Sequence, residues 1–420
     1  MVKERDIAVN VEEVFSDYLK RAPQEVDRYE AEGKDSFLAR AERFISRGEA
    51  IQFVMPGFPA KSPNDVYKVL GTFPDGAEEV AFLQFEDFAR KVDRVYTPGV
   101  NIHLVSDGFV FNDLVGVPDE NVRKYASACK ELTRGMPIKW HNVFDFYPNT
   151  NKAELISGIL TEFGMSDEEL RERIQKDPDT TMLYNGMHKF MQQDLRWPAE
   201  YSKNRIKEEA KPVAKEMIKR SEAYTGLIKK VFPDCVRLSC HPSVNDGAKY
   251  SWQFIPGDMS WGAPWHNVLK IDPQGKYSLT KREIALKDGL EIVTERGRPY
   301  FVRSPGTTVG IKRDLADIPE KDVVRSTPEE AMSSPVGTVY LVRSPVLKEK
   351  GDHIILINGG LVAKPQGMRP ETLEFPIPKN NPLNNLPSDG STLLLRLRGD
   401  SLERFYRTHN VAPLQESIVS

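Results

Sequence analysis

Hydrophobic and polar positions along the chain follow two periods. Within the first fifty residues, VEEVFSDYLKRA and FLARAERFI carry apolar residues at three- and four-residue spacing, which predicts two amphipathic helices. The apolar run at 51–56 predicts a strand, and after a turn at 56–64 the segment EEVAFLQFEDFARKVDRVY returns to the helical period. Strand, loop and helix are therefore expected in that order.

The middle of the chain, from about 119 to 231, is mostly helical in its pattern. It includes SDEELRERI, which opens with a capping-box pattern at Ser166 and Glu169, and a lysine-rich helix near 205–231 in which Pro212 predicts a break or kink. Short β-type runs follow, CVRLSCH, YSWQFIP and WHNVLKI, with Gly and Pro between them. This alternation predicts an α/β fold, a Rossmann-like sheet with flanking helices.

The last hundred residues have a different character. The β-like runs VGTVYLVRSP, HIILINGGLVA and STLLLRLRG are separated by the Pro- and Asn-rich PIPKNNPLNNLPSDG, which predicts a small β-rich appendage. A chain of 420 residues is also too long for one ordinary core. We therefore expect an N-terminal helical segment at 1–44, a central domain at 45–313, and a β-rich C-terminal domain at 314–420 to which the sequence assigns no role.

Charge and composition exclude several classes of protein. The 58 basic and 61 acidic residues give a net charge of −3, so no global basic field favours nucleic acid. No apolar run approaches the ~20 residues that span a bilayer, and the start of the chain is too charged for a signal peptide. We expect a cytoplasmic protein without membrane partners. Cys129, Cys235 and Cys240 do not form a disulfide pattern and are expected as buried thiols.

Polar clusters follow three of the apolar runs, at the strand ends where α/β proteins bind ligands. In the first cluster, Lys61 lies between Pro59 and Pro63 beside Ser62, so the loop offers a cation and a hydroxyl to a phosphate or carboxylate. A solvated lysine on a structural turn is the competing interpretation, and for the loop alone it is the favoured one. The spacing is not that of a Walker motif.

The second cluster is Ser106-Asp107-Gly108. An Asp-Gly pair between two apolar runs is a strong hairpin signal, so a hairpin competes with a functional interpretation. A functional Asp107 would end a strand and act as a general base or accept a hydrogen bond from an amine, and Asp113 could face the same site.

In the third cluster, RLSCHPS, Arg237, Ser239 and His241 recur at two-residue spacing and share a face if the strand is regular. Such groups among apolar neighbours need either a ligand or an internal polar network, and both interpretations stay open. Ser243 follows a proline turn, and Lys249 is close enough in sequence to reach the same rim.

A metal site is not expected. His266 precedes another apolar run, where a lone histidine is more often structural. The chain contains no HxD or HxE, HExxH or Cys-pair motif with ligand spacing, so we expect metal-free chemistry.

Several ordered blocks resemble the isonitrile (isocyanide) synthases, also called pyoverdine/dityrosine biosynthesis proteins. They are VMPGFPAKSPN, KVLGTFPD, YTPGVNIHLVSDGFVFNDLVGVPDENVRKY, LYNGMHKFMQQD, VRLSCHPS, APWHNV and YSLTKREIAL, and they span about residues 45 to 313. The resemblance implies an enzyme of secondary-metabolite biosynthesis that condenses the α-amine of an L-amino acid, such as Tyr, Trp or Val, with the C2 ketone of ribulose 5-phosphate. Phosphate loss and C–C cleavage then leave the sugar's C2 as the isonitrile carbon, a lyase reaction without a cofactor.

The resemblance also suggests roles for the polar clusters. In this assignment, phosphate or carboxylate is bound by Lys61, Ser62, Arg237 and Lys249. Asp107 and His241 transfer protons, and His266, Ser239 and Ser243 orient them. Ser106 and Asp113 make further contacts with the substrate. A downstream tailoring oxygenase is an expected partner, but the tail lacks HxD and is not expected to be that oxygenase. The competing functions are a sugar-phosphate aldolase with an imine on Lys61, and a non-catalytic sensor of an amino acid or sugar phosphate.

Overall fold

A computed structural model describes residues 4–21, 26–148, 150–241, 245–260, 262–307 and 309–311, together with the backbone of five further strands between 323 and 397. The chain divides into two compact units. The first comprises 1–132 and 137–311, and the second comprises 133–136 and 312–420. The domain boundaries expected from the sequence stay a prediction.

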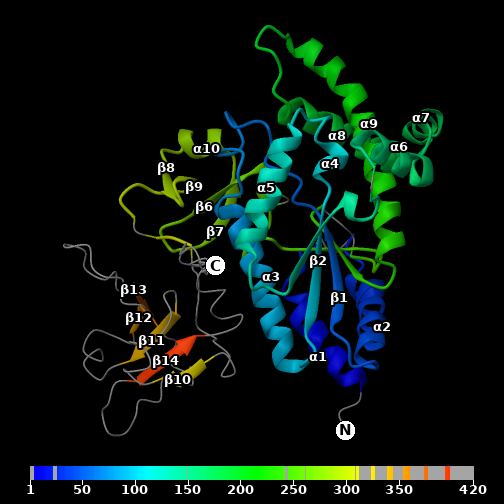
Figure 1. The fold of residues 1–420 in the computed structure, drawn as a ribbon. Helices are drawn as coiled ribbons and strands as arrows, with labels where there is room; N and C mark the ends of the chain where they lie inside the picture. The colour runs from blue at the N-terminus through cyan, green and yellow to red at the C-terminus, as the bar shows by residue number, and fades with distance from the viewer. Residues whose placement is uncertain are drawn as a thin grey trace, which may run out of the picture. The chain divides into compact units, whose positions relative to one another are not determined.

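The centre of the first unit is a five-stranded parallel sheet (Figure 1). Its strands, in the order β3-β2-β1-β4-β5, are β1 (Ile51–Pro56), β2 (Val100–Ser106), β3 (Ile138–Asn142), β4 (Val236–Ser239) and β5 (Tyr250–Ser251). Parallel strands covered by helices need apolar residues on both faces, and in β1 the consecutive residues Phe53, Val54 and Met55 are all buried. The predicted α/β class is confirmed.

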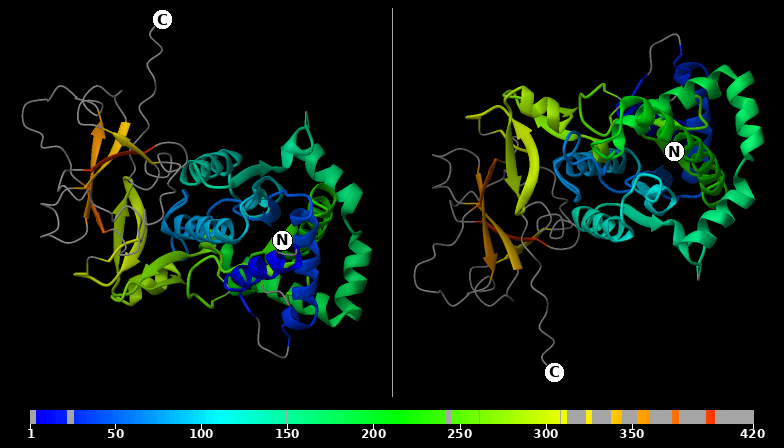
Figure 2. Two further views of the ribbon diagram at one scale, coloured as in Figure 1. Left: turned by 90° about the horizontal axis from the view of Figure 1, so that it is seen from below. Right: turned by 90° about the horizontal axis from the view of Figure 1, so that it is seen from above.

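Helices flank this sheet, and a helical insertion separates β3 from β4 (Figures 1 and 2). The flanking helices are α1 (Glu4–Ser16), α2 (Lys34–Ile45), α3 (Gly76–Val95), the short α4 (Gly108–Phe111) and α5 (Asp119–Leu132). The insertion contains α6 (Lys152–Phe163), α7 (Asp167–Lys176), α8 (Pro178–Asp194) and α9 (Lys203–Val231). The break or kink expected at Pro212 is not a break, because α9 continues through this residue as one helix.

Two further sheets complete the structure. In the first unit, β6 (Val268–Ile271), β7 (Tyr277–Thr280), β8 (Glu291–Glu295) and β9 (Arg298–Arg303) pair in the order β7-β6-β9-β8, with α10 (Arg282–Lys287) between β7 and β8. The second unit contains an antiparallel sheet in the order β10-β14-β11-β12-β13. Its strands are β10 (Val323–Ser326), β11 (Thr338–Arg343), β12 (His353–Gly359), β13 (Leu373–Pro376) and β14 (Leu393–Leu397). The expected β-rich appendage is therefore present.

Aromatic side chains join the N-terminal helices to the sheet. Phe15 of α1 stacks on Phe37 of α2 at 4.4 Å between ring centroids, and both rings contact Phe53 of β1. Trp252 lies against Phe85 of α3, with 4.7 Å between the centroids. The two helices predicted for the first fifty residues are thus part of the main hydrophobic core.

The strand order positions the site. The chain builds β2 and β3 on one side of β1 and then crosses to build β4 and β5 on the other side. In such sheets ligands bind outside the carboxyl ends of the strands, where the direction of winding reverses. Here that point lies between the ends of β1 and β4.

Two features of this region differ from the sequence prediction. Asp107-Gly108 does not form a hairpin, because β2 runs parallel to its neighbours and continues into α4. The strand β3 lies within a stretch that the pattern made mostly helical. Its residues are at most half buried, as expected at a sheet edge, so their hydrophobic pattern is weak.

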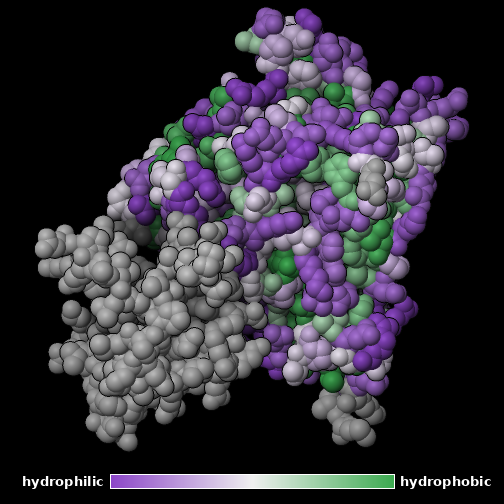
Figure 3. All heavy atoms as spheres, viewed as in Figure 1, coloured by the Kyte–Doolittle hydropathy of each residue, from purple (hydrophilic) through white to green (hydrophobic). Residues whose placement is uncertain are grey.

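The outer surface mixes hydrophilic and hydrophobic residues, as Figure 3 shows for one face. Within the described part of the chain, no helix combines the length and the apolar character that crossing a membrane requires.

Two histidines form a hydrogen-bonded pair across β2 and β3. His103 Nδ1 lies 2.9 Å from His141 Nε2, and His103 Nε2 lies 3.0 Å from Gln52 Oε1. Burial, then the charges of His141 and Lys139, lower the pKa of His103 to about 4. Burial also lowers the pKa of His141, with Asp145 opposing and Lys139 and Lys130 adding to the effect. The pair therefore stays uncharged in the folded protein at neutral pH.

This pair makes stability depend on pH. The unfolded histidine, with its ordinary pKa near 6.5, binds a proton more readily than folded His103, so its contribution is present above about pH 6.5 and is lost as pH falls toward 4. We expect urea unfolding of the wild type to show a falling free energy of unfolding between pH 6.5 and 5. His103→Gln should flatten that dependence. An equal slope in the two proteins would contradict the assignment.

Candidate functional site

The turn after β1 lies against the polar cluster after β2. Phe58, buried and with φ of +55°, presents its carbonyl oxygen to Ser106 Oγ at 3.1 Å. A side chain at Gly108 would come within 2.3 Å of the Pro59 carbonyl oxygen, so only glycine fits there. A positive φ at a buried phenylalanine is a strained conformation of the kind that surrounding structure must enforce, and such strain clusters at functional sites.

The carboxyl group of Asp107 lies where few partners are available to stabilise its charged form. It lies between the end of β2 and the start of α4, and its Oδ1 has no hydrogen-bond partner among the described residues. Burial raises the pKa of Asp107 to about 7, against a smaller opposing effect of its own backbone N–H. A carboxyl that titrates near neutral pH can both accept and release a proton during a reaction.

Arg237 of β4 belongs to the same neighbourhood. Its Nη2 donates to Thr225 Oγ1 at 3.1 Å, while its buried Nε has no partner among the described residues. Tyr224 connects it to Asp107: burial raises the pKa of Tyr224 well above its ordinary value, Asp107 adds to this rise, and Arg237 opposes it. The Tyr224 hydroxyl donates to the Val105 carbonyl at 2.9 Å. The Arg237 guanidinium, whose Nε has no partner among the described residues, therefore lies in the same region as Asp107.

His241 and Lys249 add an imidazole and an amine. Both residues have solvent-exposed surface, yet protein atoms surround their ionisable groups. Desolvation, then Lys249 and His266, lower the pKa of His241 to about 4, although contact with solvent screens these charges. Desolvation and Arg237 lower the pKa of Lys249. Burial raises the pKa of Cys240 to about 12, with Asp107 adding to the rise and Lys249 opposing it.

A second cluster surrounds Asp194, the last residue of α8, which is 1% exposed. Its Oδ1 accepts hydrogen bonds from Lys68 Nζ at 2.6 Å and Ser62 Oγ at 2.8 Å, and His266 Nδ1 lies 3.3 Å from it. Burial alone would raise the pKa of Asp194, but His266 and Lys68 hold it well below its ordinary value. The carboxylate therefore stays ionised and joins α8 to residues from two other segments.

Lys61 does not present its amine to these clusters. Its side chain is buried, and Nζ lies 2.8 Å from Glu78 Oε2 and 2.9 Å from Asp75 Oδ2 at the start of α3. Burial alone would lower the pKa of Lys61, but these two carboxylates raise it. Nζ also donates to the Pro264 carbonyl at 3.1 Å. The charge of Lys61 is therefore paired with two carboxylates inside the protein. This environment differs from both interpretations of the sequence, the solvated lysine and the exposed phosphate ligand.

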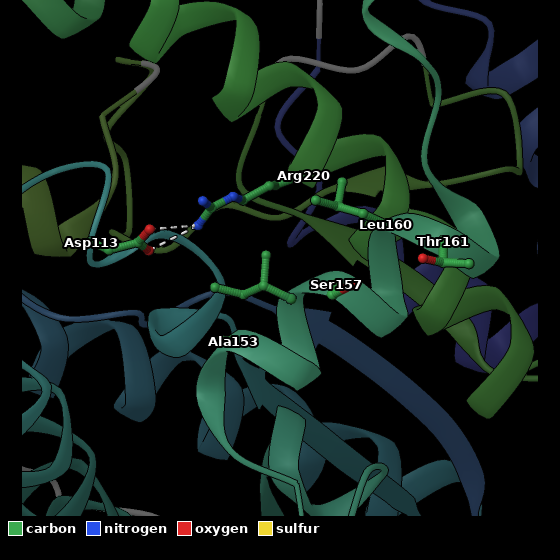
Figure 4. A pocket seen from close by; sticks show the side chains of 7 residues that line it. Asp113, Ala153, Ser157, Leu160, Thr161 and Arg220 are labelled. Carbon is green, nitrogen blue, oxygen red and sulfur yellow. Dashed lines mark hydrogen bonds and ion pairs between the residues drawn. The ribbon is translucent and has the colours of Figure 1, made fainter.

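Asp113 also has an internal partner. Arg220 of α9 binds it through Nη1, at 2.8 and 3.0 Å from the two carboxylate oxygens, and both side chains line an open hollow of about 570 Å³ beside α6 (Figure 4). None of the other residues selected from the sequence lines that hollow. A smaller hollow of about 170 Å³ is lined by Lys61 and Arg196, among others. Asp113 is thus paired with Arg220 rather than directed at Asp107.

The three predicted serines other than Ser62 have separate outcomes. Ser106 donates to the Phe58 carbonyl in the turn after β1, and Ser239 Oγ accepts from the backbone N–H of His241 at 3.2 Å. Because β4 ends at Ser239, His241 lies beyond the regular strand and not strictly on its face. Ser243 lies outside the described residues.

The structure thus places Asp107 and Arg237 within electrostatic range of Tyr224, and Lys249 within range of Arg237 and His241. His241 is in turn within range of His266. Asp194, Lys68 and Tyr224 were not among the residues selected from the sequence. Asp194 could have been found, because it ends the block LYNGMHKFMQQD. In the described ranges, no group of three or more His, Cys, Asp or Glu side chains is arranged to hold a metal ion. Chemically, the site offers two cations for anionic groups and several groups that can move protons.

Comparison with known proteins places this arrangement in a family. Residues 41–293 match the family described as pyoverdine/dityrosine biosynthesis protein. The chain is 34% identical to the L-tryptophan isonitrile synthase AmbI2 of Fischerella ambigua, over 63% of this chain and 81% of that protein. It is 32% identical to the L-tyrosine isonitrile synthase of Pseudomonas aeruginosa, over 64% of this chain and 84% of that protein.

The fold has a solved counterpart. The crystal structure of the PvcA protein from Pseudomonas aeruginosa superposes with a TM-score of 0.66 at 30% identity, covering 71% of this chain and all of that chain. The agreement in sequence and in fold confirms the family that the sequence blocks suggested.

Proposed function

The chain belongs to the pyoverdine/dityrosine biosynthesis protein family, and from that premise we propose that it is an isonitrile synthase acting on an L-amino acid. The carbon donor in this proposal is ribulose 5-phosphate. The amino acid's α-amine condenses with the C2 ketone to an imine, phosphate leaves, and C–C cleavage releases the isonitrile with the former C2 as its carbon.

The observation that supports this proposal is the set of polar residues in and around β2, β4 and β5, together with His266. Such a reaction needs cations for a phosphate and a carboxylate, and Arg237 and Lys249 are cations whose like charges repel each other in the same region. It also needs groups that exchange protons through several enolisations, and Asp107, with its pKa near 7, is suited to that task. His241 and His266 supply two further imidazoles.

Mass spectrometry tests the proposal directly. Purified protein is incubated with ribulose 5-phosphate and each of the twenty amino acids, and the products are searched for the isonitrile. With C2-labelled ribulose 5-phosphate, the label should appear in the isonitrile carbon. No isonitrile from any amino acid, with the protein folded, would overturn the proposal.

The aldolase alternative requires a nucleophilic lysine at the sugar's ketone. Lys61 is poorly suited, because its amine is buried between two carboxylates that favour its charged form. Borohydride treatment with ribulose 5-phosphate alone should therefore give no adduct on Lys61. The same digest reports on Lys249, whose lowered pKa makes it the better candidate for such an adduct. Binding of sugar phosphate or amino acid without turnover would favour the sensor.

Arg237→Ala should impair the use of ribulose 5-phosphate. A charge-assisted contact to phosphate contributes about 1.5–3 kcal/mol, so we expect the Michaelis constant for ribulose 5-phosphate to rise about ten- to a hundredfold. Stability should change little, because the guanidinium makes one hydrogen bond, to Thr225, among the contacts described for it. Steady-state kinetics and thermal unfolding measure the two effects.

Arg220→Ala is the matched control. Arg220 is 8% exposed and binds Asp113, Glu216 and the Val110 carbonyl, so its loss should lower stability. Its effect on the Michaelis constant for ribulose 5-phosphate should be small. A collapse of stability in Arg237→Ala, with normal kinetics in the remaining folded protein, would make Arg237 a structural residue instead.

A further inference from the structure

The Asp194 cluster joins segments that are far apart in the sequence. Ser62 and Lys68 come from the segment between β1 and α3, Asp194 ends α8, and His266 lies in the 3-10 turn Pro264–His266 before β6. Ser62 and Asp194 are 132 positions apart. The helical insertion thus delivers a buried carboxylate to the carboxyl-end side of the sheet.

The two ring nitrogens of His266 lie in different environments. Nδ1 is buried and makes no hydrogen bond to the described residues, although Asp194 Oδ1 lies 3.3 Å from it. The side chain as a whole is 25% exposed, so Nε2 is the ring nitrogen that can face a reacting group. The pair is therefore close but poorly aligned, and catalytic hydrogen bonds of this kind often become aligned only when substrate binds.

Other groups also face this pair. Lys68 shares the carboxylate with His266, and its ammonium lies 4.5 Å from the Phe190 ring centroid. The same ring meets His266 edge-on, with 5.0 Å between the centroids. His241 is within electrostatic range of His266, and Lys281 is within range of Lys68. Asp194 is thus a carboxylate beside His266, amid several positive or titratable groups.

We propose that Asp194 is a positioning residue for His266, and that His266 transfers protons during the isonitrile-forming reaction; the inference rests on the proposed function. Asp194 holds the proton on Nδ1, which leaves the Nε2 lone pair free. Nε2 takes a proton as a carbon of the sugar adduct enolises, and the C–H electron pair moves into the enolate. Asp194 stabilises the resulting imidazolium until Nε2 returns the proton in the next tautomerisation.

Three variants test this inference: His266→Gln, Asp194→Asn and the double variant. We expect His266→Gln to lower kcat about 10²- to 10⁴-fold, the usual contribution of a proton-transfer group. Asp194→Asn should lower kcat at least about tenfold. Because both act through one imidazole, the double variant should be about as slow as His266→Gln alone. Losses that multiply would overturn the inference.

A readout independent of turnover is the tautomer of the His266 ring, read from its ring nitrogen chemical shifts by NMR, with the signals assigned by their absence in His266→Gln. In the wild type the proton should reside on Nδ1, beside Asp194, and Asp194→Asn should increase the share of the tautomer with the proton on Nε2. A purely structural Asp194 would change the melting temperature and leave both the tautomer and the turnover per folded molecule unchanged.

The two proposals fail in different ways. Absence of isonitrile from the wild type overturns the proposed function and the catalytic part of this inference, while the tautomer measured by NMR still decides whether Asp194 positions His266. Isonitrile formation with an unchanged tautomer and normal kcat in Asp194→Asn overturns this inference alone.

Discussion

Asp107→Asn should lower turnover about 10²- to 10⁴-fold without destabilising the protein. The Oδ1 atom of this carboxyl group is buried and lacks a hydrogen-bond partner among the described residues, so the charged form is costly to the fold. An uncharged amide of the same shape should leave the melting temperature unchanged or raise it. Loss of activity with equal or greater stability is the mark of a functional residue.

The pH dependence gives an independent check. Because the folded pKa of Asp107 is raised to about 7, the folded protein holds this proton more tightly than the unfolded chain, and stability is lost as pH rises from about 4 to 7. Asp107→Asn should remove that loss. Urea unfolding at pH 5 and pH 8 measures it in both proteins.

Asp119→Asn serves as the control. Asp119 is also a carboxylate near the start of a helix, but it is 40% exposed and accepts hydrogen bonds from Lys152 and Asn112. We expect normal turnover and unchanged or slightly lower stability. If Asp107→Asn turns over at the wild-type rate, the general base lies elsewhere, and His241 and His266 become the candidates.

Lys61→Met should be the most destabilising of the substitutions considered. It leaves Asp75 and Glu78 buried without their cation, and removal of one partner of a buried ion pair costs about 3–5 kcal/mol. The damage should extend to the start of α3, because Asp75 is its N-cap and Glu78 completes the capping box. Denaturant unfolding measures the loss.

The deficit should depend on pH in a defined direction. Burial and the charge of Glu78 raise the pKa of Asp75 to about 7 despite Lys61, so acid neutralises this carboxyl readily. Lys61→Met should therefore be closer to the wild type at pH 5 than at pH 8. Lys287→Met is the control: Lys287 is 71% exposed and pairs with Glu283, and its loss should cost under about 1 kcal/mol. If Lys61→Met has normal stability but no turnover, Lys61 acts in catalysis and not in stabilising the fold.

The sequence alone was sufficient for the class of fold and for the family. Periodicity is a local property, so the helices α1 to α3 and the strands β1, β2 and β4 could be predicted from their own residues. The position of Asp107 after β2, of Arg237 in β4 and of His241 after β4 followed from the same patterns. The edge strand β3 was missed because its half-buried residues carry little hydrophobic signal.

Tertiary structure decided which charges meet. The sequence shows that Lys61 and Asp113 are polar residues near strand ends, but it does not show that Glu78 and Arg220 bind them. Asp194 meets Ser62 only because the helical insertion folds back over the sheet. The environment of a charged group depends on partners that are distant in the chain and on burial, and both are set by topology rather than by neighbouring residues. The sequence therefore determined which chemical groups stand at the strand ends, and the fold determined which of them remain available for chemistry.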